Sequence, residues 1–307
     1  MAALPLSLRA AGGALTVHLP AALAPVLRYL WGATVASAAQ LALLLGPALV
    51  LAALMHALSG LIQRHASRYL GGAYYAVFGW LGTAVHELGH ALFCLLFGHH
   101  VTGIKLFGFS SRDGTLGYVR HSYEGANPYQ RVGNFFIGLG PILLGTALLV
   151  LAARLLLGAE VFARMHAVPW DARRAGDLRA WLELAGRVAA GAGGVLATLF
   201  RPERATDWRT WVFLYLTFAI GSSISLSGAD LEGALTGLVT LAALVLAGNL
   251  ATLWAGDLAG WAAAAVARWQ TVGYVAMAFV LLADAAVALL VLLVPGLVAH
   301  VRGRGDG

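Results

Sequence analysis

Residues 72–97 read GAYYAVFGWLGTAVHELGHALFCLLF, and this stretch decides the class of fold. It is apolar and long enough to cross the hydrocarbon core of a bilayer as a helix, which takes about 20 residues. Near its middle stand His86, Glu87 and His90. Ionisable side chains within a membrane helix are costly in free energy, and where they occur they usually serve a function. The stretch therefore predicts a membrane-spanning helix that carries a reactive site.

The composition of the whole chain agrees with a membrane setting. Of its 307 residues, 60% are hydrophobic and only 11% are charged, whereas an ordinary soluble domain has about 25% charged residues. The mean hydropathy is +0.79. A soluble fold of this size would have too few charges to cover its surface, so we expect one helical bundle in lipid.

Charge and cysteine usage narrow the expected partners. The net charge of +6 comes mainly from arginines, which flank the apolar segments and suit contact with lipid headgroups. A nucleic-acid interface would need a basic face with aromatic residues or a recognisable module, so nucleic acid is not an expected partner. The one cysteine, Cys94, excludes an intramolecular disulfide and a cysteine-rich zinc site. The lipid bilayer is an expected partner, and the oligomeric state stays open.

Six apolar segments predict an all-α polytopic membrane protein with about six transmembrane helices. They cover approximately residues 30–58, 72–97, 135–157, 211–226, 234–254 and 272–298. The fourth segment is short, and we expect its helix to break near Gly221-Ser222-Ser223. After the motif helix, residues 99–131 hold two strand-like runs around a turn at 110–114, which predicts a small β-hairpin.

The arginine distribution predicts an orientation. Six spans place both termini and the hairpin on one side, where the short segments hold more arginine than the short loops opposite. By the positive-inside rule, this predicts a multi-pass protein of the cell membrane with cytoplasmic termini. The long connection at 158–210 is also rich in arginine but falls on the other side. Its amphipathic stretch at 177–200 is expected to lie along the membrane surface.

The motif itself has the spacing of a zinc site. On a helix, His86 and His90 lie one turn apart on the same face, so both imidazoles can reach one zinc ion. Glu87 stands beside them without filling a ligand position. Zinc lowers the pKa of water, and a neighbouring carboxylate can take the released proton as a general base. This is the H-E-x-x-H arrangement of zinc peptidases.

A catalytic zinc site needs a third protein ligand, with a fourth position left for water. Asp230 is the preferred candidate, because it stands among small residues in Ser227-Gly228-Ala229-Asp230-Leu231-Glu232-Gly233, where the backbone can approach the site. Asp284, which could also pair with Asn249, and Glu232 remain alternatives.

Other possible ligands near the motif are weaker candidates. Cys94 lies about 12 Å along the helix axis from His86, at 1.5 Å per residue, so one ion cannot bridge the two residues. We therefore expect Cys94 to pack in the core. His99 and His100 follow further on, and we expect them at the membrane interface unless the chain folds back.

Thr83-Ala84-Val85-His86-Glu87-Leu88-Gly89-His90-Ala91 in one span and Asp230-Leu231-Glu232-Gly233 two spans later resemble the site-2 protease family of intramembrane metallopeptidases. The resemblance, to a divergent and compact member, covers roughly half the chain. It implies that two histidines and the later aspartate hold Zn²⁺, that the glutamate activates water, and that three helices form the catalytic core. It also implies that the motif lies towards the cytoplasmic side. Asn134, before Gly140-Pro141, would then be a candidate substrate-binding residue.

The predicted organisation has four parts. Residues 1–29 form an N-terminal arm, 30–71 the first transmembrane helix and its loop, 72–233 a zinc-hydrolase core that includes 99–131 and 158–210, and 234–307 two C-terminal transmembrane helices and a tail.

The expected function is an intramembrane zinc metalloprotease that hydrolyses a peptide bond in or near a transmembrane segment of a membrane protein or peptide. In the family, a glycine directly follows the aspartate, whereas here Leu231 and Glu232 intervene. This difference keeps open a non-proteolytic zinc-binding membrane protein, such as a pseudoenzyme or assembly factor. A metal or proton transporter is a further alternative, as is a prenyl-protein-processing type of protease with Glu232 as ligand.

Overall fold

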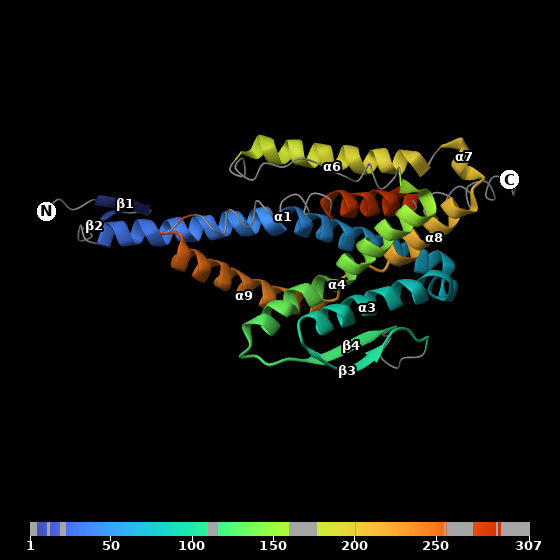
Figure 1. Ribbon diagram of the computed structural model, residues 1–307, viewed down its shortest axis with the longest axis horizontal. Coiled ribbons are helices and arrows are strands. Elements are labelled where there is room, and N and C mark those ends of the chain that lie inside the picture. Colours follow the sequence, from blue (N-terminus) through green and yellow to red (C-terminus); the bar gives the residue numbers. More distant parts are fainter. Residues whose placement is uncertain are drawn as a thin grey trace.

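The computed structural model describes residues 5–10, 13–18, 23–109, 116–159, 177–199, 201–254, 256, 273–286 and 288–289. Most of these residues are helical, and several long helices run along the longest axis of the molecule (Figure 1). The helices are α1 (Leu23–Leu70), α2 (Gly72–Tyr74), α3 (Trp80–Leu96), α4 (Pro128–Ala152), α6 (Leu178–Leu199), α7 (Pro202–Ala205), α8 (Trp208–Gly221) and α9 (Gly228–Thr252), with π-helical turns η1 (Tyr75–Gly79) and η2 (Ala153–Leu157). A short apolar helix follows at Gly273–Ala286.

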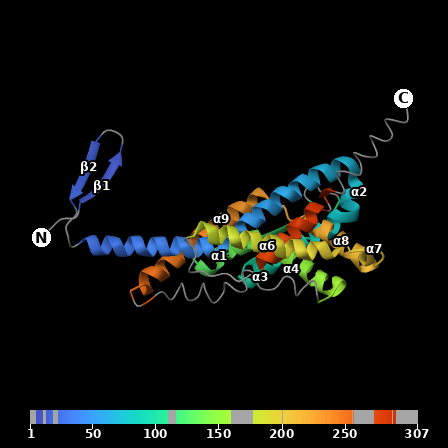
Figure 2. The ribbon, with the colours of Figure 1, turned by 90° about the horizontal axis from the view of Figure 1, so that it is seen from above.

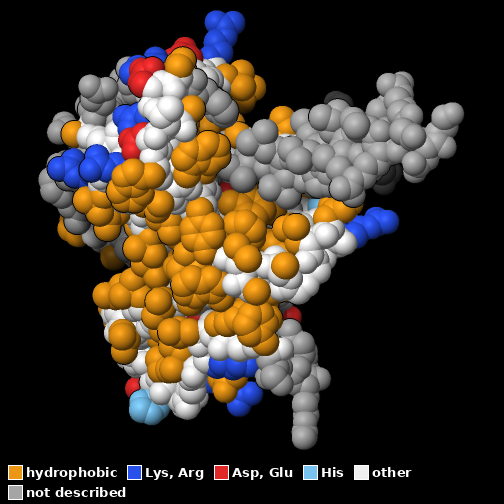
Figure 3. All heavy atoms as spheres, turned by 90° about the vertical axis from the view of Figure 1, so that its right-hand side faces the viewer, with side chains coloured by type: hydrophobic (Ala, Val, Ile, Leu, Met, Phe, Trp, Pro, Cys, Tyr) orange, Lys and Arg blue, Asp and Glu red, His pale blue; other side chains and the backbone are white. Residues whose placement is uncertain are grey.

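Among the residues that the structure describes, four helices are long and apolar enough to cross a membrane: Ala24–Leu70, Pro128–Leu157, Leu178–Leu199 and Gly228–Thr252. Hydrophobic side chains also cover a broad, continuous area of the face seen in Figure 3. Soluble monomers rarely expose apolar patches of that extent. Length, composition and surface together indicate a membrane protein.

Three of these four helices coincide with predicted spans, but the count of six is not confirmed. The predicted fourth span is the short helix α8 of 14 residues, and the predicted sixth span is described only in part. The motif helix α3 has 17 residues and continues η1 and α2 without a break. In addition, α1 extends for 48 residues, which is about 72 Å at 1.5 Å per residue. It is therefore longer than a bilayer core is thick.

Helix α6, for which a position along the membrane surface is expected, packs one face against the rest of the molecule. This helix is one of the four candidate spans. Its Leu184, Val188 and Ala192 are buried in the main hydrophobic core. Side chains of α6 also line one apolar cavity together with α1 and the helix Gly273–Ala286. The stretch is amphipathic because one face packs on other helices, which the sequence pattern alone does not distinguish from a face that lies on lipid.

The hairpin predicted after the motif helix is present. Strands β3 (His100–Lys105) and β4 (Tyr118–Ser122) pair antiparallel, with a register shift between Val101 and Gly103. The predicted turn at 110–114 lies outside the described residues. The N-terminal arm contains a second antiparallel pair, β1 (Pro5–Ala10) and β2 (Gly13–His18), which the sequence did not predict. Figure 2 shows this pair near the start of α1.

The predicted helix break is also present, because α8 ends at Gly221 and α9 begins at Gly228. Polar side chains from other helices satisfy the backbone between them. Gln63 of α1 donates to the Ser222 carbonyl (2.6 Å), and His56 Nδ1 of α1 accepts from the Leu226 N–H (2.9 Å). Such partners are required because irregular backbone at membrane depth has little access to water. They hold the break in one defined shape beside α3.

Glycines allow α3 and α4 to touch backbone to backbone. A Cβ added to Gly140 of α4 would lie 2.6 Å from the Gly89 carbonyl oxygen of α3, and one added to Gly89 would lie 2.7 Å from Gly140. Small residues permit this close approach of helices within a membrane. The crossing lies one residue from His90, so it sets the position of that side chain relative to α4.

Replacing Gly140 with alanine is expected to destabilise the protein, because the new methyl group would force the two backbones apart. Overpacking of this kind costs about 1–3 kcal/mol. Thermal unfolding of the purified protein in detergent measures the effect. Gly60→Ala in α1 is the matched control, since nothing lies within 4 Å of its added Cβ. Equal melting temperatures for the two variants would contradict the tight crossing.

Candidate metal centre

Three potential ligands converge between α3 and the start of α9. His86, His90 and Asp230 each offer one ligand atom, and these atoms all lie within 4.8 Å of one another. The two Nε2 atoms are 3.1 Å apart. Asp230 Oδ1 lies 3.3 Å from His90 Nε2, and Asp230 Oδ2 lies 3.9 Å from His86 Nε2. The structure thus brings together the three residues that the sequence analysis grouped as metal ligands.

Backbone carbonyls fix the tautomer of both histidines. His86 Nδ1 is 2.8 Å from the Ser223 carbonyl oxygen, and His90 Nδ1 is 2.8 Å from the Ile137 carbonyl oxygen. A carbonyl oxygen can only accept a hydrogen bond, so each Nδ1 carries the proton. In the neutral rings both Nε2 atoms then present lone pairs to each other. Metal-binding histidines are oriented by the same kind of second hydrogen bond.

Interruptions in two helices make these carbonyls available. Within α4, the Ile137 carbonyl would normally accept from the N–H of residue 141, but that residue is Pro141 and has no N–H. The Ser223 carbonyl lies in the break after α8, outside the ladder of helical hydrogen bonds. The proline and the broken helix therefore supply one acceptor for each imidazole.

Asp230 is held in place by the first turn of α9. Its carboxylate Oδ2 accepts from the Ser227 N–H at 2.7 Å, and Ser227 Oγ accepts from the Asp230 N–H at 3.2 Å. This reciprocal pair is a capping box. Asp230 Oδ1 is left free to face His90. The start of α9 therefore also positions a carboxylate beside the two imidazoles.

Two imidazole lone pairs and a carboxylate repel one another unless a cation lies among them. Their chemistry fits a divalent metal with nitrogen and oxygen ligands, and three protein ligands leave a fourth position open. The group is therefore a candidate metal site, because its donor atoms suit a metal, its imidazole Nε2 atoms carry lone pairs, and its three ligand atoms lie close together.

Glu87 lies beside these ligands at a cavity of about 510 Å³. Its side chain is 7% exposed and lies close to Gly117, where an added Cβ would be 2.8 Å from Glu87 Cγ. The cavity is lined by His86, Glu87, His90, Gly117, Tyr118, Val119, His121, Tyr123, Asn134, Ile137, Gly138, Ser227, Ala229, Asp230, Gly233 and Thr236. A second cavity of about 330 Å³ also reaches His86 and Glu87, and serines and Gln63 contribute to its wall. Glu87 thus lies at two cavities that can admit water.

The remaining predicted residues fall in distinct places. Asn134 of α4 is buried and lines the larger cavity, so it is near the candidate centre. Glu232 is exposed on α9. Asp284 is buried close to Gly221 rather than beside the histidine pair. Its suggested pairing with Asn249 is wrong, because Asn249 donates to two side chains of α1.

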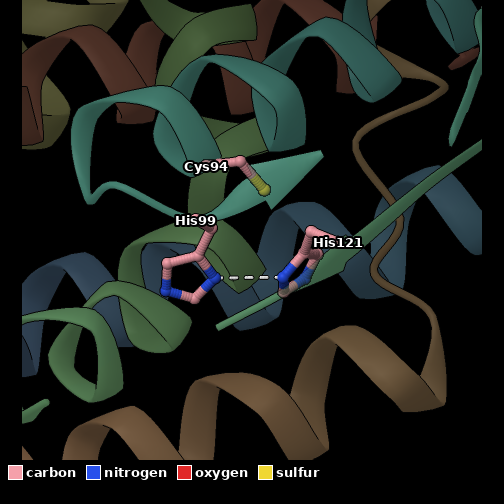
Figure 4. A group of neighbouring side chains, drawn as sticks. All are labelled: Cys94, His99 and His121. Atoms are coloured by element: carbon pink, nitrogen blue, oxygen red, sulfur yellow. Dashed lines mark hydrogen bonds between the residues drawn. The ribbon is translucent and has the colours of Figure 1, made fainter. Parts of the chain in front are cut away.

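A second group of potential ligands, which the sequence did not predict, is formed by Cys94, His99 and His121 (Figure 4). The chain folds back after α3, which is the exception allowed for His99, and His99 is buried against the C-terminal end of α3. His100 is exposed. Burial lowers the pKa of His121, and the neighbouring His99 adds to this effect, so an uncharged His121 ring that can act as a ligand is favoured.

The sequence also did not reveal Ser223, Ile137, His56 and Gln63 as supports of the site. Two of them act through backbone carbonyls, for which side-chain identity gives no signal. The available signals were Pro141 within an apolar helix and the polar residues at the C-terminal half of α1.

The chain matches no known protein family, no curated protein and no solved structure.

Proposed function

We propose that the protein is an intramembrane zinc metalloprotease of the site-2 protease type. The convergence of His86 Nε2, His90 Nε2 and the Asp230 carboxylate beside Glu87 carries this proposal. The group lies in a protein whose helices are long and apolar enough to cross a membrane. Ionisable side chains in such a setting are costly and serve a function.

Zinc is the metal that best suits two imidazoles and a carboxylate with one position open, and when bound it polarises a carbonyl oxygen and makes water more acidic. Glu87 lies next to the ligands and belongs to both cavities. It can take a proton from the attacking water and later deliver that proton to the amine of the leaving peptide. Its carboxylate is not among the ligand atoms, so it is free for this role.

The cavity suits a peptide in an extended conformation. Tyr118 and Val119 of β4 line it, and the buried amide of Asn134 lines it from α4. A transmembrane helix shields its own peptide bonds by internal hydrogen bonds, so a substrate has to unwind before hydrolysis. An unwound segment beside a strand can satisfy its freed backbone groups through main-chain hydrogen bonds. Asn134 is then placed to contact the substrate backbone.

Removal of the metal is the first test of this proposal. Purified protein in liposomes with a transmembrane peptide is expected to cleave the peptide, to lose cleavage after treatment with a zinc chelator, and to regain it when zinc is returned. Peptide fragments are identified by mass spectrometry. Zinc binding without cleavage of any peptide from a panel of transmembrane segments would favour a non-proteolytic zinc protein, and movement of metal into the liposomes would favour a transporter.

A further inference from the structure

The second group of ligands is assembled from two parts of the chain. Cys94 lies in the last turns of α3, His99 directly follows this helix, and His121 lies in β4. Figure 4 shows the three side chains gathered in one space, with the two rings facing each other. Their potential ligand atoms all lie within 4.8 Å of one another. Cys94 is fully buried and His99 is 4% exposed, whereas His121 is partly buried and lines the larger cavity.

A glycine turn places His99 next to Cys94. Gly98 has a positive φ of 68°, a conformation that glycine adopts without strain. The His99 N–H donates to the Cys94 carbonyl (2.8 Å), and the Gly98 N–H donates to the Leu95 carbonyl (3.2 Å). These two bonds form a Schellman motif. The motif reverses the chain, which is why a side chain five residues after Cys94 can share its surroundings.

The hydrogen bonds of His99 leave a lone pair directed into the group. His99 Nε2 is 2.8 Å from the Gln130 carbonyl oxygen, so Nε2 carries the proton and the Nδ1 lone pair accepts from the Nδ1–H of His121. The ring of Tyr123 stacks on His99 with centroids 4.9 Å apart and holds its orientation. His99 Nδ1 lies 3.0 Å from His121 Nδ1. Two nitrogens on one tetrahedral zinc ion are about 3.3 Å apart, so the two imidazoles are already close to the spacing that a shared zinc ion requires.

We propose that Cys94, His99 and His121 form a second zinc site, which fastens strand β4 to the motif helix α3. One sulfur and two imidazole nitrogens suit zinc, whereas calcium and magnesium prefer oxygen ligands. Binding releases the thiol proton to solvent, because the thiolate is the ligand.

The second metal would stabilise a wall of the catalytic cavity. Three residues of β4 line that cavity, namely Tyr118, Val119 and His121. A zinc ion shared by β4 and α3 fixes this wall relative to His86 and Glu87, which lie on the same helix. Three protein ligands leave the fourth position of this ion for water, and the site is independent of whether the protein cleaves peptides.

Cobalt substitution tests the site in the unaltered protein. Cobalt bound to a thiolate gives a sulfur-to-metal charge-transfer absorption in the near ultraviolet, and Cys94 is the only cysteine of the chain. We expect cobalt-loaded wild-type protein to show this absorption and zinc-loaded wild-type protein to hold two zinc ions per chain. One zinc ion and no charge-transfer absorption in the wild type would overturn the proposal, whatever the behaviour of the variants.

Variants then assign the ligands. Cys94→Ala is expected to lose the absorption and one zinc ion, and His121→Ala is expected to lose one zinc ion. His100→Ala is the matched control, since this exposed neighbour lies outside the group, and it should keep both ions. Retention of two zinc ions by His121→Ala would overturn the three-residue site. In each of these variants the His86–His90–Asp230 centre should still hold its own ion. A result that contradicts the second site therefore does not contradict the first.

Discussion

Glu87→Gln is expected to abolish peptide cleavage while the protein keeps its metal. The substitution preserves the size of the side chain but removes the base that takes a proton from water. General acid–base catalysis contributes about 100- to 10,000-fold to rate, so cleavage of a transmembrane peptide should fall by at least the lower figure. Glu87 lies at the cavity beside His86 and His90 but supplies no ligand atom, so zinc content should not change.

The matched control for this prediction is Glu232→Gln, which makes the same chemical change at an exposed position of α9. Cleavage by this variant should equal that of the wild type. If Glu87→Gln cleaved the peptide at the wild-type rate, the assigned role of Glu87 as general base would be wrong. If neither wild type nor variant cleaved any transmembrane peptide but both held zinc, the proteolytic function itself would be contradicted.

The Asp230→Asn variant is expected to lose peptide cleavage because it binds the metal weakly, whereas Glu87→Gln loses cleavage because the general base is removed. An amide oxygen is neutral and a poorer zinc ligand than a carboxylate, so zinc should bind more weakly. We therefore expect excess zinc to restore part of the cleavage by Asp230→Asn and none of the cleavage by Glu87→Gln. Cleavage rates measured over a series of zinc concentrations distinguish the two.

Asp230 also takes part in the capping box of α9, so its two roles have to be separated. Ser227→Ala removes the hydroxyl that accepts from the Asp230 N–H and should cost about 1 kcal/mol of stability. It leaves the Asp230 carboxylate in place. A lower melting temperature with unchanged zinc affinity is therefore expected for Ser227→Ala. An equal loss of zinc in both variants would indicate that Asp230 acts only as a helix cap.

The sequence was informative where chemistry depends on side-chain identity and short spacing. Two histidines four residues apart and a glutamate between them predict one face of a helix and one kind of site, and the structure places His86 and His90 with their Nε2 atoms 3.1 Å apart. Asp230 was predicted from a local feature as well, because small residues and glycines around an acid indicate a helix break at which the backbone can approach the site. The hairpin and the break after α8 followed from equally local turn signals.

The features that escaped prediction depend on distant segments. The carbonyls of Ile137 and Ser223 fix the histidine tautomers, yet their role comes from a proline and a helix break on other helices. His121 reaches Cys94 only because Gly98 reverses the chain and β4 returns along α3. The packing of α6 escaped for a related reason, since an amphipathic pattern fits both a bundle face and a lipid surface. Spacing along one helix could exclude Cys94 from the group of His86 and His90, but it could not reveal that Cys94 lies beside His99 and His121.

Counting the zinc ions held by purified variants tests the central claim most directly. Cys94→Ala protein should hold one zinc ion per chain, because only the His86–His90–Asp230 centre remains. Adding His86→Ala or Asp230→Ala to this background should each reduce the content to none, since both residues contribute ligands to the same ion. If the Asp230→Ala combination kept its zinc while the His86→Ala combination lost it, Asp230 would not be a ligand, and the proposed centre would be contradicted.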